Sequence, residues 1–142
     1  MALNKLYLGA TREAVGRFRR ADAIAPRDPA RWTWLQGLGR ALIQLGDDIA
    51  AIDALSQAMD CNPDYAAAEA LAGNIEAAGR YLAEYCALEP DMTLERFAQQ
   101  RSSVPPEAVS EVYRRESERI LEGLRRAGMP GEPDIEHQLS TF

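Results

Sequence analysis

The chain has 142 residues, of which 46% are apolar, 27% charged and 7% aromatic, the composition of a single soluble globular domain. Its formal net charge of −6 argues against nonspecific nucleic-acid binding, because such binding neutralises phosphates with clustered Lys and Arg. No apolar run approaches the roughly 20 residues of a membrane-spanning helix, and the N-terminus lacks the apolar core of a signal peptide, so we expect a cytoplasmic protein without membrane contact.

Three segments of the chain share one spacing, and each ends at a proline: Pro26, Pro63 or Pro90. In each segment a glycine stands seventeen residues before the proline, an alanine twelve before it and a large apolar residue eight before it. In chain order these residues are Gly9, Ala14 and Phe18, then Gly46, Ala51 and Leu55, then Gly73, Ala78 and Leu82. Glycine tolerates the positive φ of a tight turn between helices, and the residue before a proline is pushed out of the α region. Since no alternating run predicts a strand, the spacing indicates an all-α internal repeat.

The middle segment is the most complete of the three. We expect its first helix over residues 31–44, a turn at residues 45–48 and its second helix over residues 48–61. Gly39 falls inside the first of these helices and has no role in a turn. Close packing against a neighbouring helix is therefore its expected use.

The middle segment also carries a family resemblance. Its spacing resembles that of a tetratricopeptide repeat (TPR), a 34-residue unit of two antiparallel helices. The resemblance is carried by Leu35, Gly39, Leu42, Gly46, Ala51, Leu55, Ala58 and Pro63. It implies a TPR-like solenoid of antiparallel helix pairs, about two and a half to three repeats long, with repeats over residues 1–26, 30–63 and 64–90.

The third segment is shortened, because Pro63 and Pro90 are only 27 positions apart. Its second helix keeps the shared offsets, so we expect a short first helix over residues 64–72 and a turn at Gly73. Two alternatives stay open: a turn at Gly79, or one unbroken helix through the whole segment. A glycine inside the second helix would reflect tight packing or mere tolerance.

Two capping helices are expected after the repeats. The first covers residues 91–101, with Asp91 or Thr93 as its N-cap. The second is the longest helix, over residues 107–127, and it stops at Gly128. We expect it to lie on the last repeat as a solvating cap.

The arginines of this last helix, Arg114, Arg115 and Arg119, alternate with acids and are predicted to face water. The helical domain would span residues 1–130. Residues 131–142 show no packing pattern and are predicted to form a flexible tail.

A second resemblance joins the PRDP motif, MTLERF and the LEGLRRAGMP motif near the C-terminus. In combination they resemble the C-terminal TPR region of certain bacterial class III adenylate/guanylate cyclases. The cyclase catalytic domain is absent from the sequence, so the resemblance implies a regulatory or scaffolding segment and no catalytic residue. Two alternatives remain: the C-terminal part of a cyclase whose catalytic domain is missing here, and a truncated remnant without independent function.

No residue pattern predicts catalysis, a metal site or a cofactor. Asp47 and Asp48 are explained as an N-cap and a first-turn acid, and no calcium-type loop of oxygen ligands is present. His137 lies in the tail without a partner that would preorganise it. Cys61 and Cys86 form no CxxC and occupy apolar helical positions, so buried thiols are expected rather than a disulfide.

The surface expected to bind a protein or peptide partner is the concave face of the repeats. In the middle repeat this face is predicted to consist of Thr33, Gln36, Arg40, Ile43 and Gln44. Arg40 could pair with a carboxylate of the partner. Replacing Arg40 by Glu is then expected to abolish binding and to leave thermal stability unchanged.

Two other features could contribute to association. Of Trp32 and Trp34, at least one is expected to pack on the preceding helix, and the other could be an exposed anchor for a partner. The first segment also lacks the start of its first helix. Leu3, Leu6 and Tyr7 would then form an uncapped edge through which the chain could self-associate.

Overall fold

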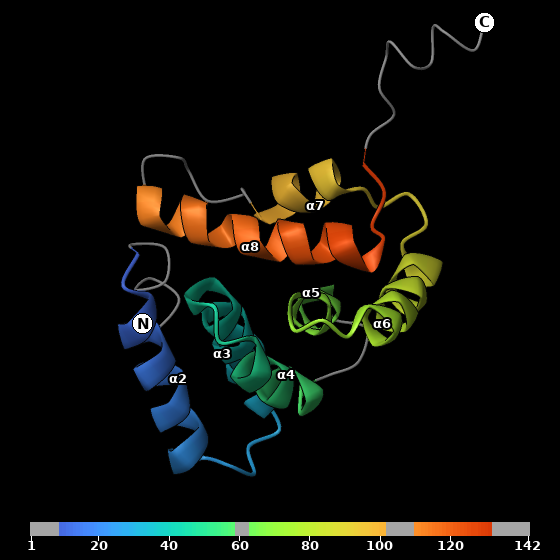
Figure 1. Cartoon of the computed structure of the whole chain (residues 1–142). Helices are drawn as coiled ribbons and strands as arrows, with labels where there is room; N and C mark the ends of the chain where they lie inside the picture. The colour runs from blue at the N-terminus through green and yellow to red at the C-terminus, as the bar shows by residue number, and fades with distance from the viewer. Residues whose placement is uncertain (1–8, 59–62, 102–109, 132–142) are drawn as a thin grey trace, which may run out of the picture.

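The computed structural model describes residues 9–58, 63–101 and 110–131, and within these ranges the chain is all helical, without a strand. The helices are α2 (Thr11–Ile24), α3 (Arg31–Leu45), α4 (Asp48–Ser56), α5 (Pro63–Leu71), α6 (Ile75–Leu88), α7 (Leu94–Arg101) and α8 (Glu111–Ala127) (Figure 1). The all-α prediction is confirmed for this part of the chain. None of these helices is long and apolar enough to span a membrane.

Glycine turns join the helices into two hairpins, α3–α4 and α5–α6. Gly46 has φ +85° and Gly73 has φ +96°, and both backbones adopt the left-handed conformation that glycine favours. At each turn the glycine N–H donates to the carbonyl three residues back, and the next N–H donates to the carbonyl five back. This is the Schellman arrangement, which satisfies the last carbonyls of a helix. The predicted glycine turns are confirmed.

The third segment has the short first helix that the spacing favours. α5 has 9 residues and α3 has 15. The alternatives of a turn at Gly79 or one unbroken helix are wrong, because the turn lies at Gly73 and Gly79 is inside α6. A Cβ on Gly79 would meet only the Ala127 carbonyl oxygen, at 3.8 Å, so tolerance and not close packing explains this glycine.

Small residues let α3 approach both of its neighbours closely. A Cβ on Gly39 would lie 2.3 Å from Leu55 Cγ of α4, which confirms the predicted close packing. A Cβ on Gly37 would lie 2.5 Å from the Phe18 ring of α2, a contact that the sequence analysis did not anticipate. The repeat alanines Ala14, Ala51 and Ala78 are all fully buried. The core therefore depends on close helix crossings as much as on bulky side chains.

Several helix ends differ from the predictions. α8 begins at Glu111, not at residue 107, because Ser110 is its N-cap and accepts a hydrogen bond from the Tyr113 N–H at 3.0 Å. Thr93 is the N-cap of α7, since its hydroxyl accepts from the Arg96 N–H at 3.2 Å. α4 ends at Ser56 and not at residue 61.

Some predictions fall outside the described residues. These concern Leu3, Leu6, Tyr7, Asp60, Cys61, Glu107, His137 and the tail from residue 132. Cys86 has a free, half-buried thiol.

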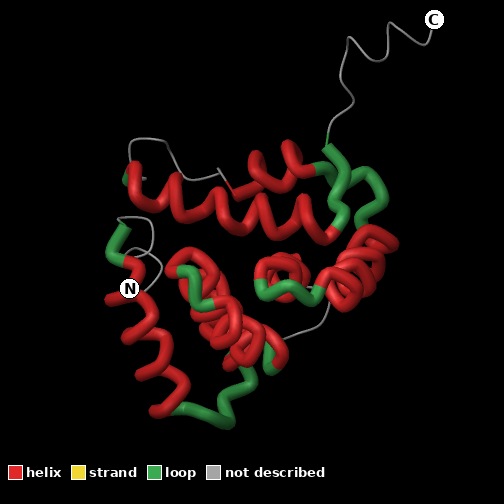
Figure 2. Tube along the Cα trace, viewed as in Figure 1, coloured by secondary structure: helices red, strands yellow, loops and turns green. Residues whose placement is uncertain are grey.

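α8 lies across the other helices instead of on the last hairpin alone. Figures 1 and 2 show it running above α3, α5 and α6, and its most extensive contact is with α5. Its first turns reach as far as Gly9 and Thr11, at the start of α2. The prediction of a cap on the last repeat is correct for α5 and α6, but it missed the contact with α3 and α2.

Candidate functional site

The residues predicted to bind a partner form one stripe along α3, but they differ in accessibility. Thr33 is exposed and Gln36 half-buried, near the start of the helix. Arg40, in the middle, is half-buried. Ile43 is fully buried and Gln44 is 4% exposed, at the end of α3 that α8 crosses. The structure therefore leaves one end of the stripe open and covers the other.

The surface of α3 and α5 on which α8 lies is called the groove below. Three side chains of α8 are buried against the rest of the protein: Tyr113, Ile120 and Leu124. Between them the helices come so close that a Cβ on Gly123 would lie 2.6 Å from the Ala67 carbonyl oxygen of α5. Only glycine at this position allows α8 to rest on the backbone of α5.

Arg119 fastens α8 to the turn between α3 and α4. Its Nε donates to the Ile43 carbonyl at 2.9 Å, and one terminal nitrogen contacts both Asp48 carboxylate oxygens, at 2.9 and 3.1 Å. A guanidinium held by both a carboxylate and a carbonyl makes stronger hydrogen bonds than a neutral donor would. The prediction that Arg119 only faces water is therefore wrong. Its partners are distant in the sequence, and the pattern of alternating charges gave no sign of them.

Two neighbouring side chains add to this attachment. The Thr11 hydroxyl donates to Glu116 at 2.7 Å, which ties α8 to the start of α2. The Gln44 amide donates to the Ser117 hydroxyl at 3.0 Å. Glu116, Ser117 and Arg119 together are called the α8 latch.

Beneath α8 the groove contains polar groups that are incompletely matched. Asp64 is fully buried at the start of α5, and its Oδ2 lies 3.9 Å from Arg40 Nε, an ion pair too long for a hydrogen bond. Arg40 Nε and Gln44 Oε1 are buried and make no hydrogen bond within the described part of the chain. A buried polar group left in this state costs about 1–3 kcal/mol. The groove thus has hydrogen-bonding capacity that α8 does not use.

The two tryptophans divide as the sequence suggests. Trp34 is half-buried, and its indole N–H donates to Asp22 of α2 at 3.1 Å. Arg31 binds the same carboxylate at 2.6 Å. The Arg31 and Trp34 hydrogen bonds hold the pKa of the Asp22 carboxyl below its ordinary value. Trp32 is 40% exposed beside the open end of the groove stripe.

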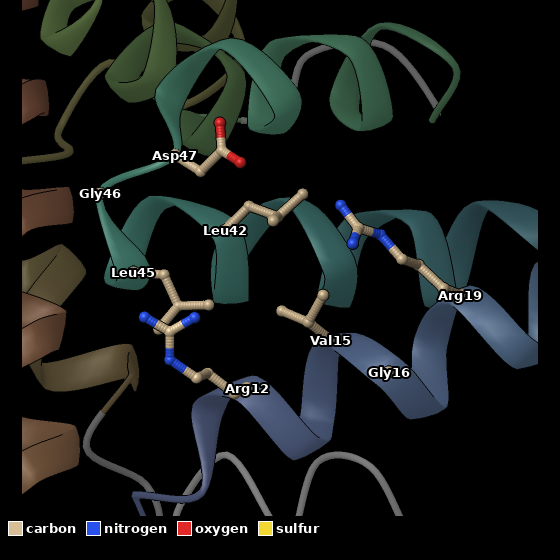
Figure 3. Close-up of a pocket in the computed structure, with 8 residues that line it drawn as sticks. All are labelled: Arg12, Val15, Gly16, Arg19, Leu42, Leu45, Gly46 and Asp47. Atoms are coloured by element: carbon tan, nitrogen blue, oxygen red, sulfur yellow. The ribbon is translucent and has the colours of Figure 1, made fainter.

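An open pocket of about 540 Å³ lies on another part of the surface, between α2 and the α3–α4 turn (Figure 3). Its lining residues are Arg12, Val15, Gly16, Arg19, Leu42, Leu45, Gly46 and Asp47. This lining contains no His, Cys or hydroxyl that could act as a nucleophile or a base. Asp47 is engaged as the N-cap of α4, as predicted, and accepts from the Ala50 N–H.

The described ranges contain no group of three or more His, Cys, Asp or Glu side chains placed to hold a metal ion. The Tyr65 and Tyr81 rings lie with their centroids 4.5 Å apart, and burial, followed by the Tyr81 hydrogen bond, raises the pKa of the Tyr65 phenol. A phenol with a raised pKa is a poorer base and nucleophile at neutral pH. No protein-family model, curated protein or solved structure matches the chain.

Proposed function

We propose that this chain is a noncatalytic, TPR-like module that binds protein partners through the α3 face of the groove. The observation that carries the proposal is that this groove already holds an amphipathic helix, α8. Binding of a helix by an apolar groove with a few polar contacts is a recurrent mode of peptide recognition. A groove with this shape and chemistry suits a helical segment of another protein.

The comparison of the two hairpins supports the TPR-like part of the proposal. Gly46 and Gly73 have similar φ angles and the same pair of turn hydrogen bonds. Ala51 and Ala78, five residues after these glycines, are both fully buried. Such equivalence in structure as well as in spacing is typical of repeat proteins.

The proposal includes a regulatory or scaffolding role in a nucleotide-cyclase signalling system. It is supported by the sequence resemblance to the C-terminal TPR regions of class III cyclases. The open end of the α3 stripe, with Thr33, Gln36 and the exposed Trp32, offers a first contact surface. Exposed tryptophans are enriched among the residues that contribute most to protein binding.

The test is a titration of the whole isotope-labelled chain with a panel of synthetic amphipathic helices, followed by NMR. Each peptide has a counterpart with a central proline, which breaks the helix. We expect helical peptides to shift the amides of Thr33 and Gln36 and their counterparts to leave them unchanged. Gln36→Ala should weaken the binding, whereas the control Gln99→Ala, on the exposed side of α7, should not. If no helical peptide shifts the α3 amides, the proposal is overturned.

A further inference from the structure

We infer that α8 is a displaceable occupant of the groove, and that the groove binds a partner helix with the same pattern as α8. This inference rests on the proposed function and names the partner's chemistry. The pattern is a central glycine, with arginine four residues before it, isoleucine three before it and leucine one after it. In α8 these residues are Gly123, Arg119, Ile120 and Leu124.

Each position of this pattern answers a contact in the groove. The glycine permits the backbone approach to Ala67. The arginine meets the carboxylate of Asp48 and the Ile43 carbonyl. Ile120 and Leu124 are 2% and 0% exposed, and they fill the apolar space on either side of the glycine. The groove therefore selects for size, charge and shape together, as a specific binding site does.

The buried polar groups indicate that α8 is not the best ligand for this groove. Gln44 donates to Ser117, but its Oε1 makes no hydrogen bond among the described residues, because the Ser117 hydroxyl engages only the amide nitrogen. A side-chain amide in place of the serine could accept from Gln44 Nε2 and donate to Oε1 at once. A partner helix with Asn at this position would satisfy both atoms and could outcompete α8.

Displacement is also favoured by how α8 is held. The latch is polar and part-exposed: the Arg119 side chain is 40% exposed and that of Asp48 14%. Ion pairs that remain in contact with water contribute little net stability, because water competes for both charges. A second helix that offers the same groups can therefore replace α8 at modest cost.

The test uses the whole chain and a labelled synthetic peptide of residues 110–130, followed by fluorescence anisotropy. The Arg119→Ala chain has a weakened latch, so we expect it to bind the peptide at least tenfold more tightly than the unchanged chain does. A Gly123→Leu peptide is the matched control, and it should bind at least tenfold more weakly, since its side chain collides with the Ala67 backbone. A Ser117→Asn peptide should bind several-fold more tightly than the original.

Hydrogen exchange on the unchanged chain provides a second readout that needs no variant. Excess Ser117→Asn peptide should lower the protection of amides 111–127 of the chain's own α8 and preserve that of α3 and α5. Equal binding of the original and Gly123→Leu peptides would overturn the inference. So would helical peptides that bind the α3 face while α8 stays protected, although the proposed function would then survive. Failure of every helical peptide to bind would overturn both.

Discussion

The hairpins α3–α4 and α5–α6 share the same turn but bury their first helix in different ways. α3 is long, and the glycines at 37 and 39 let it contact α2 and α4 directly. α5 is two turns shorter, and its buried side chains are mostly alanines: Ala66, Ala67, Ala68 and Ala70. Alanine buries little apolar surface, so α5 needs a close-fitting neighbour on each side.

α8 is that neighbour, because its most extensive contact in the described structure is with α5. Ile120 and Leu124 supply the apolar bulk that α5 lacks, and Gly123 brings the two backbones together. The difference between the hairpins teaches that the first is stabilised by its own repeat neighbours. The second depends on a helix from outside the repeats.

The largest expected effect breaks the first hairpin. Ala51 is fully buried on α4, where α4 crosses α3, so Ala51→Trp should overpack this crossing and cost more than about 3 kcal/mol of unfolding free energy. Ala83→Trp, at an exposed position of α6, is the matched control and should change little. Urea denaturation followed by circular dichroism measures both. If the two variants unfold at the same urea concentration, the assignment of the α3–α4 contact is wrong.

The next effect tests the link between the hairpins. Arg40 of α3 faces the buried Asp64 of α5, and Arg40→Glu would place two carboxylates together. Breaking a buried ion pair costs about 3–5 kcal/mol, and the 20% exposure of Arg40 and the 3.9 Å separation favour the lower end of that range. This reverses the expectation from the sequence that the variant would leave stability unchanged. Arg40→Gln, which removes the charge without repulsion, should lose less. A melting temperature for Arg40→Glu equal to that of the unchanged chain would return Arg40 to the role of a partner-binding side chain.

Three glycine substitutions sharpen the comparison between the hairpins. Gly123→Ala forces a Cβ against the Ala67 backbone, which cannot move aside easily, and should cost about 2–3 kcal/mol. Gly37→Ala meets the tip of the Phe18 ring, which can shift, so its cost should be smaller. Gly79→Ala meets open space and should stabilise α6 by about 0.5–1 kcal/mol. Thermal unfolding should rank the three variants in this order, and a Gly123→Ala variant as stable as Gly79→Ala would show that α5 does not depend on α8.

Local features of this fold were predictable from the sequence. The turns at Gly46 and Gly73 and the short α5 follow from a repeated spacing, because a positive φ and a helix end depend on nearby residues. Trp34 was expected to pack on the preceding helix for the same reason, and it does.

The covered half of the candidate site was not predictable in the same way. Ile43 and Gln44 were assigned to the binding face, and their burial depends on where a helix some 70 residues later comes to lie. A signal was nevertheless present, since Gly123 stands between Ile120 and Leu124 on a helix that otherwise needs no glycine. Next to the alanine run of α5, this pattern indicates two small-residue helices in close contact.

The smallest expected effect concerns the link between α2 and α3, which both hairpins leave outside their turns. The pKa of Asp22 is lowered in the folded state by Arg31 and by Trp34. A lowered pKa means that the carboxylate stabilises the fold above its unfolded pKa and that this contribution is lost as the pH falls through the folded pKa. Asp22→Asn should therefore lower the melting temperature slightly at pH 7 and make stability less dependent on pH below about 4. Thermal melts at pH 7 and pH 3 measure both changes. An Asn variant that lost as much stability between these two pH values as the unchanged chain would show that the Asp22 contact contributes nothing to holding α2 on α3.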